Sequence, residues 1–478
     1  MKRFKAKILL FMLLCLSANV FAQHKITFEI ENYTNDTLVI GNYIMDRQLV
    51  HDTLFAVEEG VFVLEDTLDQ GVYLALTYPN RSFMQFLVSD VEKEFRVQFD
   101  YENSNHIKYT GSPDNSNFQS YIDYLNIQRP ISDSLKAVRD AAQERGEDVS
   151  KLNQRIQAIG DRVLTMADSL IEAHPDYFST VLLKSNKEIE MPEFGETEDE
   201  RVAQYLYFKK HYFDFIDLAD PRVLRTPFLF HRVNYFIDKL TPAHPDSVIL
   251  AIDHLLGSME PAEETYMYYL SHFLNSYYKA KIVGMDAVYV HLAENYYGAG
   301  KASWAQQETI DKIMDKAMKI KPLLIGKTAP DIQVYQEDGT PVSISTIDYE
   351  YLVLMFWAPD CGHCKKSMPA FVEFSEKYKE KGVKVFAICT KYRDKVKNCW
   401  ESVKEKDMLG FINGADEFNR SDFKLKYNVD STPKVFILDK DREIIIKNIG
   451  AEQLEQVFEN VIFNTASQEE PKEEMQNK

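Results

Sequence analysis

Two cysteines separated by two residues, Cys361 and Cys364, carry the clearest chemistry in this sequence. They follow a continuously apolar run, residues 351–357, which predicts a strand buried on both faces of a sheet, and they open a helix. The first N–H groups of a helix lack partners and stabilise a thiolate, so Cys361 is predicted to be a nucleophile with a lowered pKa. Cys364 lies within bridging distance on the same helix face, so it is predicted to resolve the mixed disulfide that Cys361 forms.

The same spacing also occurs in half of a zinc site, which needs a second pair of ligands. Cys389 and Cys399 are too far apart in sequence to form a second pair of this kind, and no pair of histidines lies near them. The histidines of the central region form no His-Glu-x-x-His motif. The sequence therefore predicts no metal and no cofactor.

A second signal lies about 70 residues after the cysteines, where Thr432 and Pro433 precede an apolar run that ends at Leu438. Proline cannot donate a hydrogen bond to a sheet, so it is tolerated at the first residue of a strand. A cis bond before Pro433 would present the backbone of Thr432 to the two cysteines. A trans proline that simply ends a loop is the ordinary alternative.

Residues 323–465 resemble the TlpA/ResA-like envelope members of the thioredoxin superfamily. The motifs that carry the resemblance are Gly326-Lys-Thr-Ala-Pro330-Asp331, Asp338-Gly339, Phe356-Trp357, Cys361 to Cys364, Pro369, Thr432-Pro433 and Leu438-Asp439. The resemblance implies an α/β thioredoxin fold and a thiol-disulfide oxidoreductase in which Cys361 attacks, Cys364 resolves and Pro433 is cis.

The resemblance also suggests what surrounds these cysteines. We expect Trp357 and Thr432 to contact the substrate and His363 to tune the reactivity of Cys361. The implied partners are protein thiols and disulfides of the cell envelope, with a membrane electron donor of the DsbD/CcdA type.

Two positions depart from the family pattern and bear on proton transfer. Thioredoxins carry an Asp six residues before the first cysteine, where this chain has Met355. ResA-type proteins carry a Glu three residues after the second cysteine, where this chain has Ser367. Neither usual proton acceptor for the resolving thiol is therefore present.

Residues 1–22 have the pattern of a cleavable secretory signal: a basic start, an apolar run too short to span a bilayer, and small residues before a cleavage site between Ala22 and Gln23. A lipoprotein anchored at Cys15 is disfavoured because that cysteine lies inside the apolar run. We therefore expect an exported protein of the periplasm or cell envelope. Cleavage removes four of the 55 basic residues and none of the 74 acidic ones, which moves the net charge from −19 to about −23. Such a charge disfavours nucleic acid as a partner.

Export also affects the other cysteines, because disulfides persist outside the cytoplasm. Cys389 ends an apolar run, and we place Cys399 well inside the following helix, about 10 Å along it by helical rise. That separation exceeds bridging geometry, so we predict two buried thiols rather than a second disulfide.

The composition, 45% hydrophobic and 13% aromatic, is that of a globular chain with several domains. Short alternating runs predict an antiparallel β domain over 23–115, and helical periodicity predicts an all-α domain over 116–322. Within the latter, an a/d seam at residues 152–170 is too short for a coiled coil and predicts packing inside the domain. Part of this helical region resembles a domain of unknown function found before thioredoxin modules. The thioredoxin-like domain is expected over 323–466 and a disordered tail over 467–478.

The predicted function is that of an exported thiol-disulfide oxidoreductase. One alternative is an envelope protein that binds a peptide or glycan, for which the aromatic-rich helices could form a concave face and the thioredoxin module only a scaffold. A thiol peroxidase is a third hypothesis, but those enzymes need Thr or Ser where this chain has Ala358. The sequence does not set the direction of electron flow.

Overall fold

The computed structural model describes residues 23–79, 82–103 and 106–463. The predicted signal segment and the predicted tail lie outside the described residues. The chain forms two compact units. The first holds the described residues up to Thr241 together with His254–Tyr266, and the second holds Pro242–Asp253 together with the described residues from Met267. The domain boundaries expected at 115 and 322 stay predictions.

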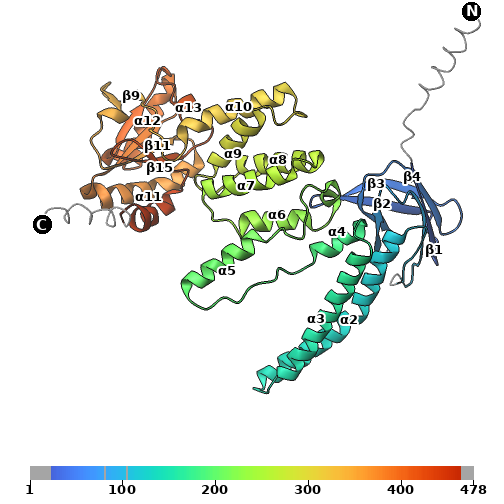
Figure 1. The fold of residues 1–478 in the computed structure, drawn as a ribbon. Coiled ribbons are helices and arrows are strands. Elements are labelled where there is room, and N and C mark those ends of the chain that lie inside the picture. Colours follow the sequence, from blue (N-terminus) through green and yellow to red (C-terminus); the bar gives the residue numbers. More distant parts are fainter. Residues whose placement is uncertain (1–22, 80–81, 104–105, 464–478) are drawn as a thin grey trace, which may run out of the picture. The chain divides into compact units, whose positions relative to one another are not determined.

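The first unit begins with two four-stranded sheets, in the orders β4-β1-β7-β8 and β3-β2-β5-β6 (Figure 1). Their inner faces share one apolar core, in which the rings of Phe28 and Phe86 meet edge to face at 5.3 Å. All pairs are antiparallel except β1 and β7, which run parallel. The strands are β1 (His24–Glu31), β2 (Thr37–Ile44), β3 (Arg47–Phe55), β4 (Val61–Asp66), β5 (Gly71–Leu76), β6 (Phe83–Val88), β7 (Glu94–Asp100) and β8 (Lys108–Thr110).

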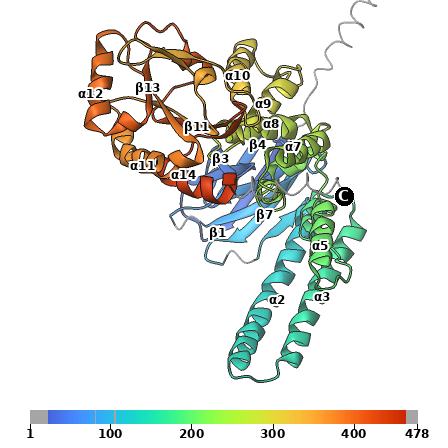
Figure 2. The same ribbon diagram turned by 90° about the vertical axis from the view of Figure 1, so that its left-hand side faces the viewer.

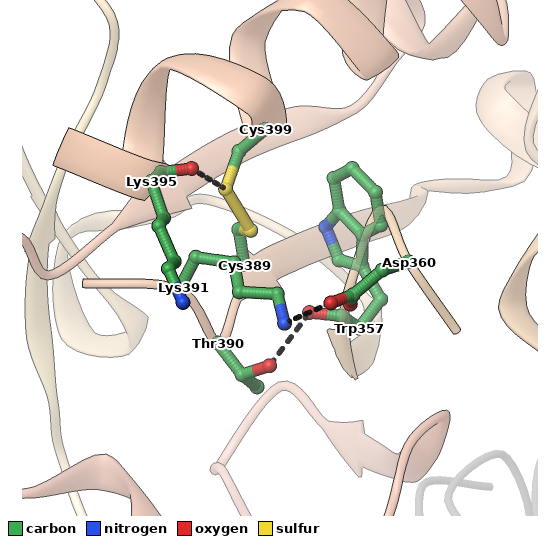
Figure 3. Close-up of a disulfide and its surroundings, with 7 residues drawn as sticks. All are labelled: Trp357, Asp360, Cys389, Thr390, Lys391, Lys395 and Cys399. Carbon is green, nitrogen blue, oxygen red and sulfur yellow. Dashed lines mark hydrogen bonds and ion pairs between the residues drawn. A yellow bond between two sulfur atoms is a disulfide. The ribbon is translucent and has the colours of Figure 1, made fainter.

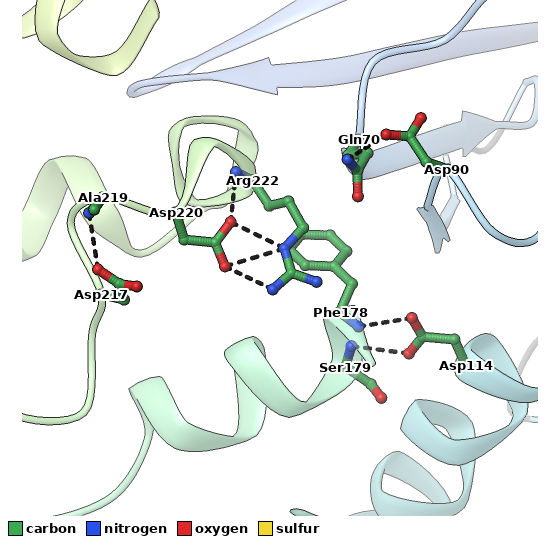
Figure 4. Close-up of polar contacts among 9 residues, drawn as sticks. All are labelled: Gln70, Asp90, Asp114, Phe178, Ser179, Asp217, Ala219, Asp220 and Arg222. Carbon is green, nitrogen blue, oxygen red and sulfur yellow. Dashed lines mark hydrogen bonds and ion pairs between the residues drawn. The ribbon is translucent and has the colours of Figure 1, made fainter. Parts of the chain in front are cut away.

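The helices of the first unit begin with a long hairpin of α2 and α3. The predicted seam lies on α3, and Val163 and Leu170 of that seam pack around a buried cluster that includes Tyr121 of α2, so the seam is used inside the chain. Asp114, near the start of α2, accepts hydrogen bonds from the backbone N–H groups that open α4 (Figure 4). The helices are α2 (Pro113–Glu144), α3 (Ser150–Ala173), α4 (Phe178–Ser185), α5 (Glu198–Lys210), η1 (Pro221–Arg225), α6 (Leu229–Asp238), α7 (Pro245–Met259) and α8 (Glu263–Tyr278), the last two running into the second unit.

The second unit continues with helical segments and ends in a seven-stranded mixed sheet, in the order β10-β9-β13-β12-β11-β14-β15 (Figure 2). The helical segments are α9 (Asp286–Leu292), η2 (Ala293–Tyr297), α10 (Gln307–Ile320) and η3 (Lys321–Leu323). The strands are β9 (Gln333–Tyr335), β10 (Pro341–Ser343), β11 (Tyr351–Trp357), β12 (Val383–Cys389), β13 (Ile412–Ala415), β14 (Lys434–Asp439) and β15 (Ile444–Lys447). The helices around the sheet are η4 (Ile344–Thr346), α11 (Gly362–Tyr378), η5 (Lys379–Lys381), η6 (Arg393–Val396), α12 (Lys397–Glu405), η7 (Met408–Gly410), α13 (Phe423–Lys426), α14 (Ala451–Val457) and η8 (Phe458–Ile462).

Strand β11 is central, parallel to β12 and antiparallel to β14. Its alternate residues face two different cores. Met355 and Trp357 pack in a core that includes α11, α12 and α14. Leu354 and Phe356 pack in the other core, which includes α13. This two-sided burial explains why residues 351–357 are continuously apolar. The fold class predicted from the sequence is confirmed: N-terminal β sheets, a helical middle and a thioredoxin-like α/β end.

An ion pair between a buried lysine and a partly exposed aspartate ties the helical segments to this sheet. The Lys447 ammonium, 3% exposed, lies 2.5 Å from Asp286 Oδ2 and donates to the carbonyl of Leu323 at 2.5 Å. In the described part of the chain, no helix is both long and apolar enough to cross a membrane.

Candidate redox site

The two cysteines lie where β11 gives way to α11. Trp357 ends the strand, and Cys361 is the residue that caps the helix beginning at Gly362. The sulfur of Cys361 accepts a hydrogen bond from the backbone N–H of Cys364 at 3.1 Å. Cys361 is partly exposed and Cys364 is 1% exposed. The pair therefore combines a reachable sulfur with a shielded one.

Thr432 and Pro433 reach this pair because β14 runs antiparallel to β11. The register places Lys434 opposite Phe356, so the residues before β14 and those after β11 lie at the same edge of the sheet. The Thr432–Pro433 bond is cis, and the Cys361 thiol donates to the carbonyl of Thr432 at 3.1 Å. Two sequence signals about 70 residues apart thus form one site.

The environments of the two sulfurs move their pKa values in opposite directions. Burial acts to raise the pKa of Cys361, but hydrogen bonds from the Cys364 and Thr432 side chains and from the backbone N–H groups of Cys364 and His363 outweigh it and leave the pKa lowered. Burial, helped by the hydrogen bond with Cys361, raises the pKa of Cys364 to about 12. The arrangement suits an attacking thiolate at Cys361 and a protonated thiol at Cys364.

The positions that depart from the family pattern offer the buried thiol no base. Met355 is fully buried in β11. The hydroxyl of Ser367 donates to the carbonyls of His363 and Cys364, at 3.0 and 3.3 Å. His363 itself is exposed on the first turn of α11.

Trp357, expected from the sequence to contact the substrate, is 2% exposed and packs in the core that also holds Cys364. Its indole Nε1 is buried without a hydrogen-bond partner among the described residues. Thr432, the other expected contact, is half-buried beside Cys361. Of the two, only Thr432 presents surface next to the nucleophile.

The prediction of two free thiols at Cys389 and Cys399 is wrong, because these residues form a disulfide with a Cα–Cα distance of 6.2 Å (Figure 3). The η6 turn follows β12 and brings the chain back, so that α12 begins only at Lys397. Cys399 therefore lies in the first turn of α12 and not far along a helix. The misplaced helix start, not the bridging criterion, caused the error.

This disulfide borders the turn that carries the redox pair. The carbonyl of Trp357 accepts from the backbone N–H of Thr390 at 2.8 Å and from its hydroxyl at 3.1 Å (Figure 3). Lys391 forms an ion pair with Asp360 at 2.6 Å, one residue before Cys361. The disulfide lies at the end of β12, and the two residues after it bond to Trp357 and Asp360 in the turn that precedes α11. Among the residues described, no group of three or more His, Cys, Asp and Glu side chains could hold a metal ion.

Two family models match different parts of the chain. The Redoxin family matches residues 324–462, and a domain of unknown function, DUF5106, matches residues 150–319. The chain is 31% identical to the thiol-disulfide oxidoreductase ResA of Bacillus cereus over 134 residues, 28% of this chain and 74% of that protein. It is 29% identical to ResA of Geobacillus kaustophilus over 141 residues, 29% and 78% of the two chains.

Solved structures are similar to parts of the chain as well. A domain of a possible thiol-disulfide isomerase from Cytophaga hutchinsonii is 31% identical, covering 31% of this chain and 97% of its own, with a TM-score of 0.29. A thioredoxin-like protein from Bacteroides caccae is 16% identical, covering 57% and 98%, with a TM-score of 0.45. The resemblance predicted from residues 323–465 is confirmed by the Redoxin and ResA matches.

Proposed function

Because this chain belongs to the ResA family of thiol-disulfide oxidoreductases, we propose that Cys361 and Cys364 exchange disulfides with proteins of the cell envelope. The observation that carries the proposal is the geometry of the pair. Partly exposed Cys361 accepts a hydrogen bond from the backbone N–H of Cys364 at the start of α11 and contacts the carbonyl of Thr432. Cys364 is buried behind it, and its pKa is raised where that of Cys361 is lowered. A dithiol built in this way attacks from one sulfur and resolves from the other.

In the reducing direction, the Cys361 thiolate attacks one sulfur of the partner's disulfide, and the other partner sulfur leaves as a thiolate that takes up a proton. Cys364 then loses its proton and attacks the sulfur of Cys361, which releases the second partner thiol. Two electrons pass from the protein to the partner, which becomes a dithiol while Cys361 and Cys364 become a disulfide. The reverse sequence oxidises a partner dithiol.

Export supports the choice of envelope partners. Residues 1–22 have the composition of a cleavable signal, and a mature net charge of about −23 suits protein partners better than nucleic acid. A membrane electron donor of the DsbD/CcdA type would regenerate the dithiol if the protein acts as a reductant. A mature N-terminus at Gln23, read by mass spectrometry from the native host, tests the cleavage between Ala22 and Gln23.

The test of the proposal is insulin reduction by the purified mature protein with dithiothreitol as the terminal reductant. Wild type should accelerate the reduction, and Cys361→Ala should return it to the background rate. Cys364→Ser is the matched variant, because it keeps the nucleophile but not the resolving attack, and it should accumulate mixed disulfides visible on non-reducing gels. Turnover by Cys361→Ala, or no turnover by wild type, would overturn the assignment.

Two measurements address the alternatives and the direction. Rapid consumption of peroxide by the reduced protein would favour a thiol peroxidase, against the Ala358 found where such enzymes need a hydroxyl. Acid trapping and alkylation in the intact organism report whether Cys361 and Cys364 are held reduced or oxidised. A reduced pair indicates a reductase or isomerase, and an oxidised pair indicates a disulfide donor.

A further inference from the structure

A cavity of about 700 Å³ lies between α8, α9 and α10 in the second unit. Its volume falls in the range of about 300 to 1,000 Å³ typical of sites for small ligands and side chains. Four aromatic side chains, Tyr278, Tyr289, Tyr297 and Trp304, share the lining, and we call the cavity the aromatic pocket. Its other lining residues are Ser271, Leu274, Asn275, Ala305, Gln306, Thr309, Lys312, Ile313, Asp315 and Lys316.

The rings that line the aromatic pocket differ in exposure: Tyr278 is 51% exposed, whereas two of the others are buried. Tyr289 and Tyr297 are buried, and the ring of Tyr289 packs 5.5 Å from that of Tyr278. The ammonium of Lys316 covers the ring of Tyr278 at 5.5 Å. A sugar ring binds best on a free aromatic face, whereas aliphatic and aromatic side chains fill a pocket of this kind.

A positive charge at the rim of the aromatic pocket favours an acidic group in the ligand. Lys312 pairs with Glu308 at 2.6 Å, but within the described chain no carboxylate forms an ion pair with Lys316. Lys316 is therefore a cation that remains open to an acidic group of a ligand, held in place by its contact with Tyr278.

The side of the aromatic pocket formed by α9 is bonded to β15 of the sheet. Asp286 opens α9, which carries Tyr289, and is bonded to Lys447 of β15. Lys447 lies opposite Phe436 of β14, two residues beyond the start of that strand at Lys434. The ion pair therefore ties one side of the aromatic pocket to β15, which pairs with β14, the strand that begins at the redox site.

The end of α10 is tied to the same part of the sheet. The Lys447 ammonium that bonds Asp286 also donates to the carbonyl of Leu323, three residues after the end of α10, at 2.5 Å. Lys434 directly follows Pro433, and the carbonyl of Thr432 contacts the Cys361 sulfur. The α9 and α10 sides of the aromatic pocket are thus both bonded to β15, the neighbour of the strand that starts beside Cys361.

We propose that the aromatic pocket is a docking site for a polypeptide segment of the redox partner. The segment contains an apolar side chain next to an acidic residue, and it belongs to the same chain as the cysteine attacked by Cys361. The proposal rests on the proposed function and adds a specificity site to it. Docking would raise the local concentration of the partner's disulfide at Cys361 without changing the exchange chemistry.

The experiment uses synthetic disulfide-linked peptide dimers and the full mature protein in its reduced form. In one series, an Asp-Phe-Leu segment follows the cysteine after two, five or eight glycine and serine residues. In the reference series, Ser-Gly-Ser replaces that segment, and oxidised glutathione is the small disulfide. Single-turnover rates are measured by alkylation and mass spectrometry against peptide concentration.

Wild type should reduce at least one Asp-Phe-Leu peptide with a second-order rate constant about tenfold above that for its reference peptide, mainly because a lower peptide concentration half-saturates the rate. Trp304→Ala and Lys316→Glu should each remove most of that preference. Met318→Ala and Lys279→Glu are matched controls that keep it, because Met318 and Lys279 are exposed near the aromatic pocket and do not line it. Urea unfolding of each variant checks that the fold is retained.

The outcomes separate the two proposals. If wild type reduces glutathione and reference peptides but shows no preference at any spacing, the docking site is refuted and the redox function stands. If wild type reduces nothing, both fail. Binding of maltohexaose or of an N-acetylglucosamine hexamer that Trp304→Ala abolishes, with no change in peptide preference, would assign the pocket to a glycan and also refute the proposal.

Discussion

Resolution of the mixed disulfide should be the step most sensitive to pH, because Cys364 must lose its proton in a buried site. A thiol with a pKa of about 12 is a thiolate in about one molecule in 100,000 at pH 7, against about one in 100 at the ordinary value of 9.0. That difference of about three pH units corresponds to about 4 kcal/mol.

Part of this free-energy cost of deprotonating Cys364 is removed when Cys361 is bonded to the partner in the mixed disulfide, because the hydrogen bond between the two cysteines then changes. Burial is the larger cause of the raised pKa and persists. We therefore expect resolution at pH 7 to be about 100-fold slower than attack by an exposed thiol, and to accelerate about tenfold for each pH unit between about pH 6 and 9.

Replacing Ser367 tests the reasoning, because this residue stands one helical turn from Cys364 and now bonds only to backbone carbonyls. Ser367→Glu should supply a base and speed resolution by about 100-fold at pH 7, with a flatter pH dependence. Ser367→Gln is the control, since it has the same size and no basic group.

The assay mixes reduced protein with 5,5′-dithiobis(2-nitrobenzoate) in a stopped-flow instrument. The first aromatic thiolate released reports attack by Cys361, and the second reports resolution by Cys364. Equal second-phase rates from about pH 6 to 9 in wild type, or equal rates for the Ser367→Glu and Ser367→Gln variants, would refute the argument that a missing base limits this step.

Three further predictions follow from contacts of the second unit. His363→Pro removes a backbone N–H that stabilises the Cys361 thiolate, so the dithiol form should lose stability and the potential, measured against glutathione buffers, should become more reducing; an unchanged or more oxidising potential contradicts this. Asp286→Ala should lower the free energy of unfolding by about 3 to 5 kcal/mol in urea, because it leaves the Lys447 ammonium buried without its carboxylate, whereas a loss below about 1 kcal/mol would mean that the pair is not buried in solution. Cys389→Ser should cost about 3 kcal/mol by the loop-closure entropy of its ten-residue separation, and a thiol count that finds four free thiols in the reduced native protein under mild reductant would show that the disulfide is absent.

The cysteine pair and Pro433 could be singled out in the sequence because each of the two signals is local. A continuous apolar run sets β11, the cysteines follow it directly, and Pro433 stands at the start of β14. Antiparallel pairing of β11 with β14 then brings the two signals together. That pairing joins segments about 70 residues apart, so it was expected from the resemblance to the thioredoxin superfamily and not from the residues alone.

Other elements could not be predicted from the sequence because their signal is weak or not local. Strand β3 is exposed along almost its whole length, so it lacks the alternation that marks a strand. The parallel pairing of β1 with β7 depends on the path of the chain between them, which periodicity does not encode. The aromatic pocket needs three helices to converge, and aromatic residues that line it look in sequence like those of any core.

The four cysteines of the second unit show why spacing alone does not assign roles to sulfur atoms. Cys389 and Cys399 share a core with Cys364, and all three are at most 1% exposed. An exchange reaction requires the attacking thiolate to reach the disulfide, so burial protects the Cys389–Cys399 bond from external thiols. Cys361 alone among the four is partly exposed and has a lowered pKa. A reaction with a partner protein must therefore begin at Cys361, and the helix start that lowers its pKa also keeps Cys364 out of reach.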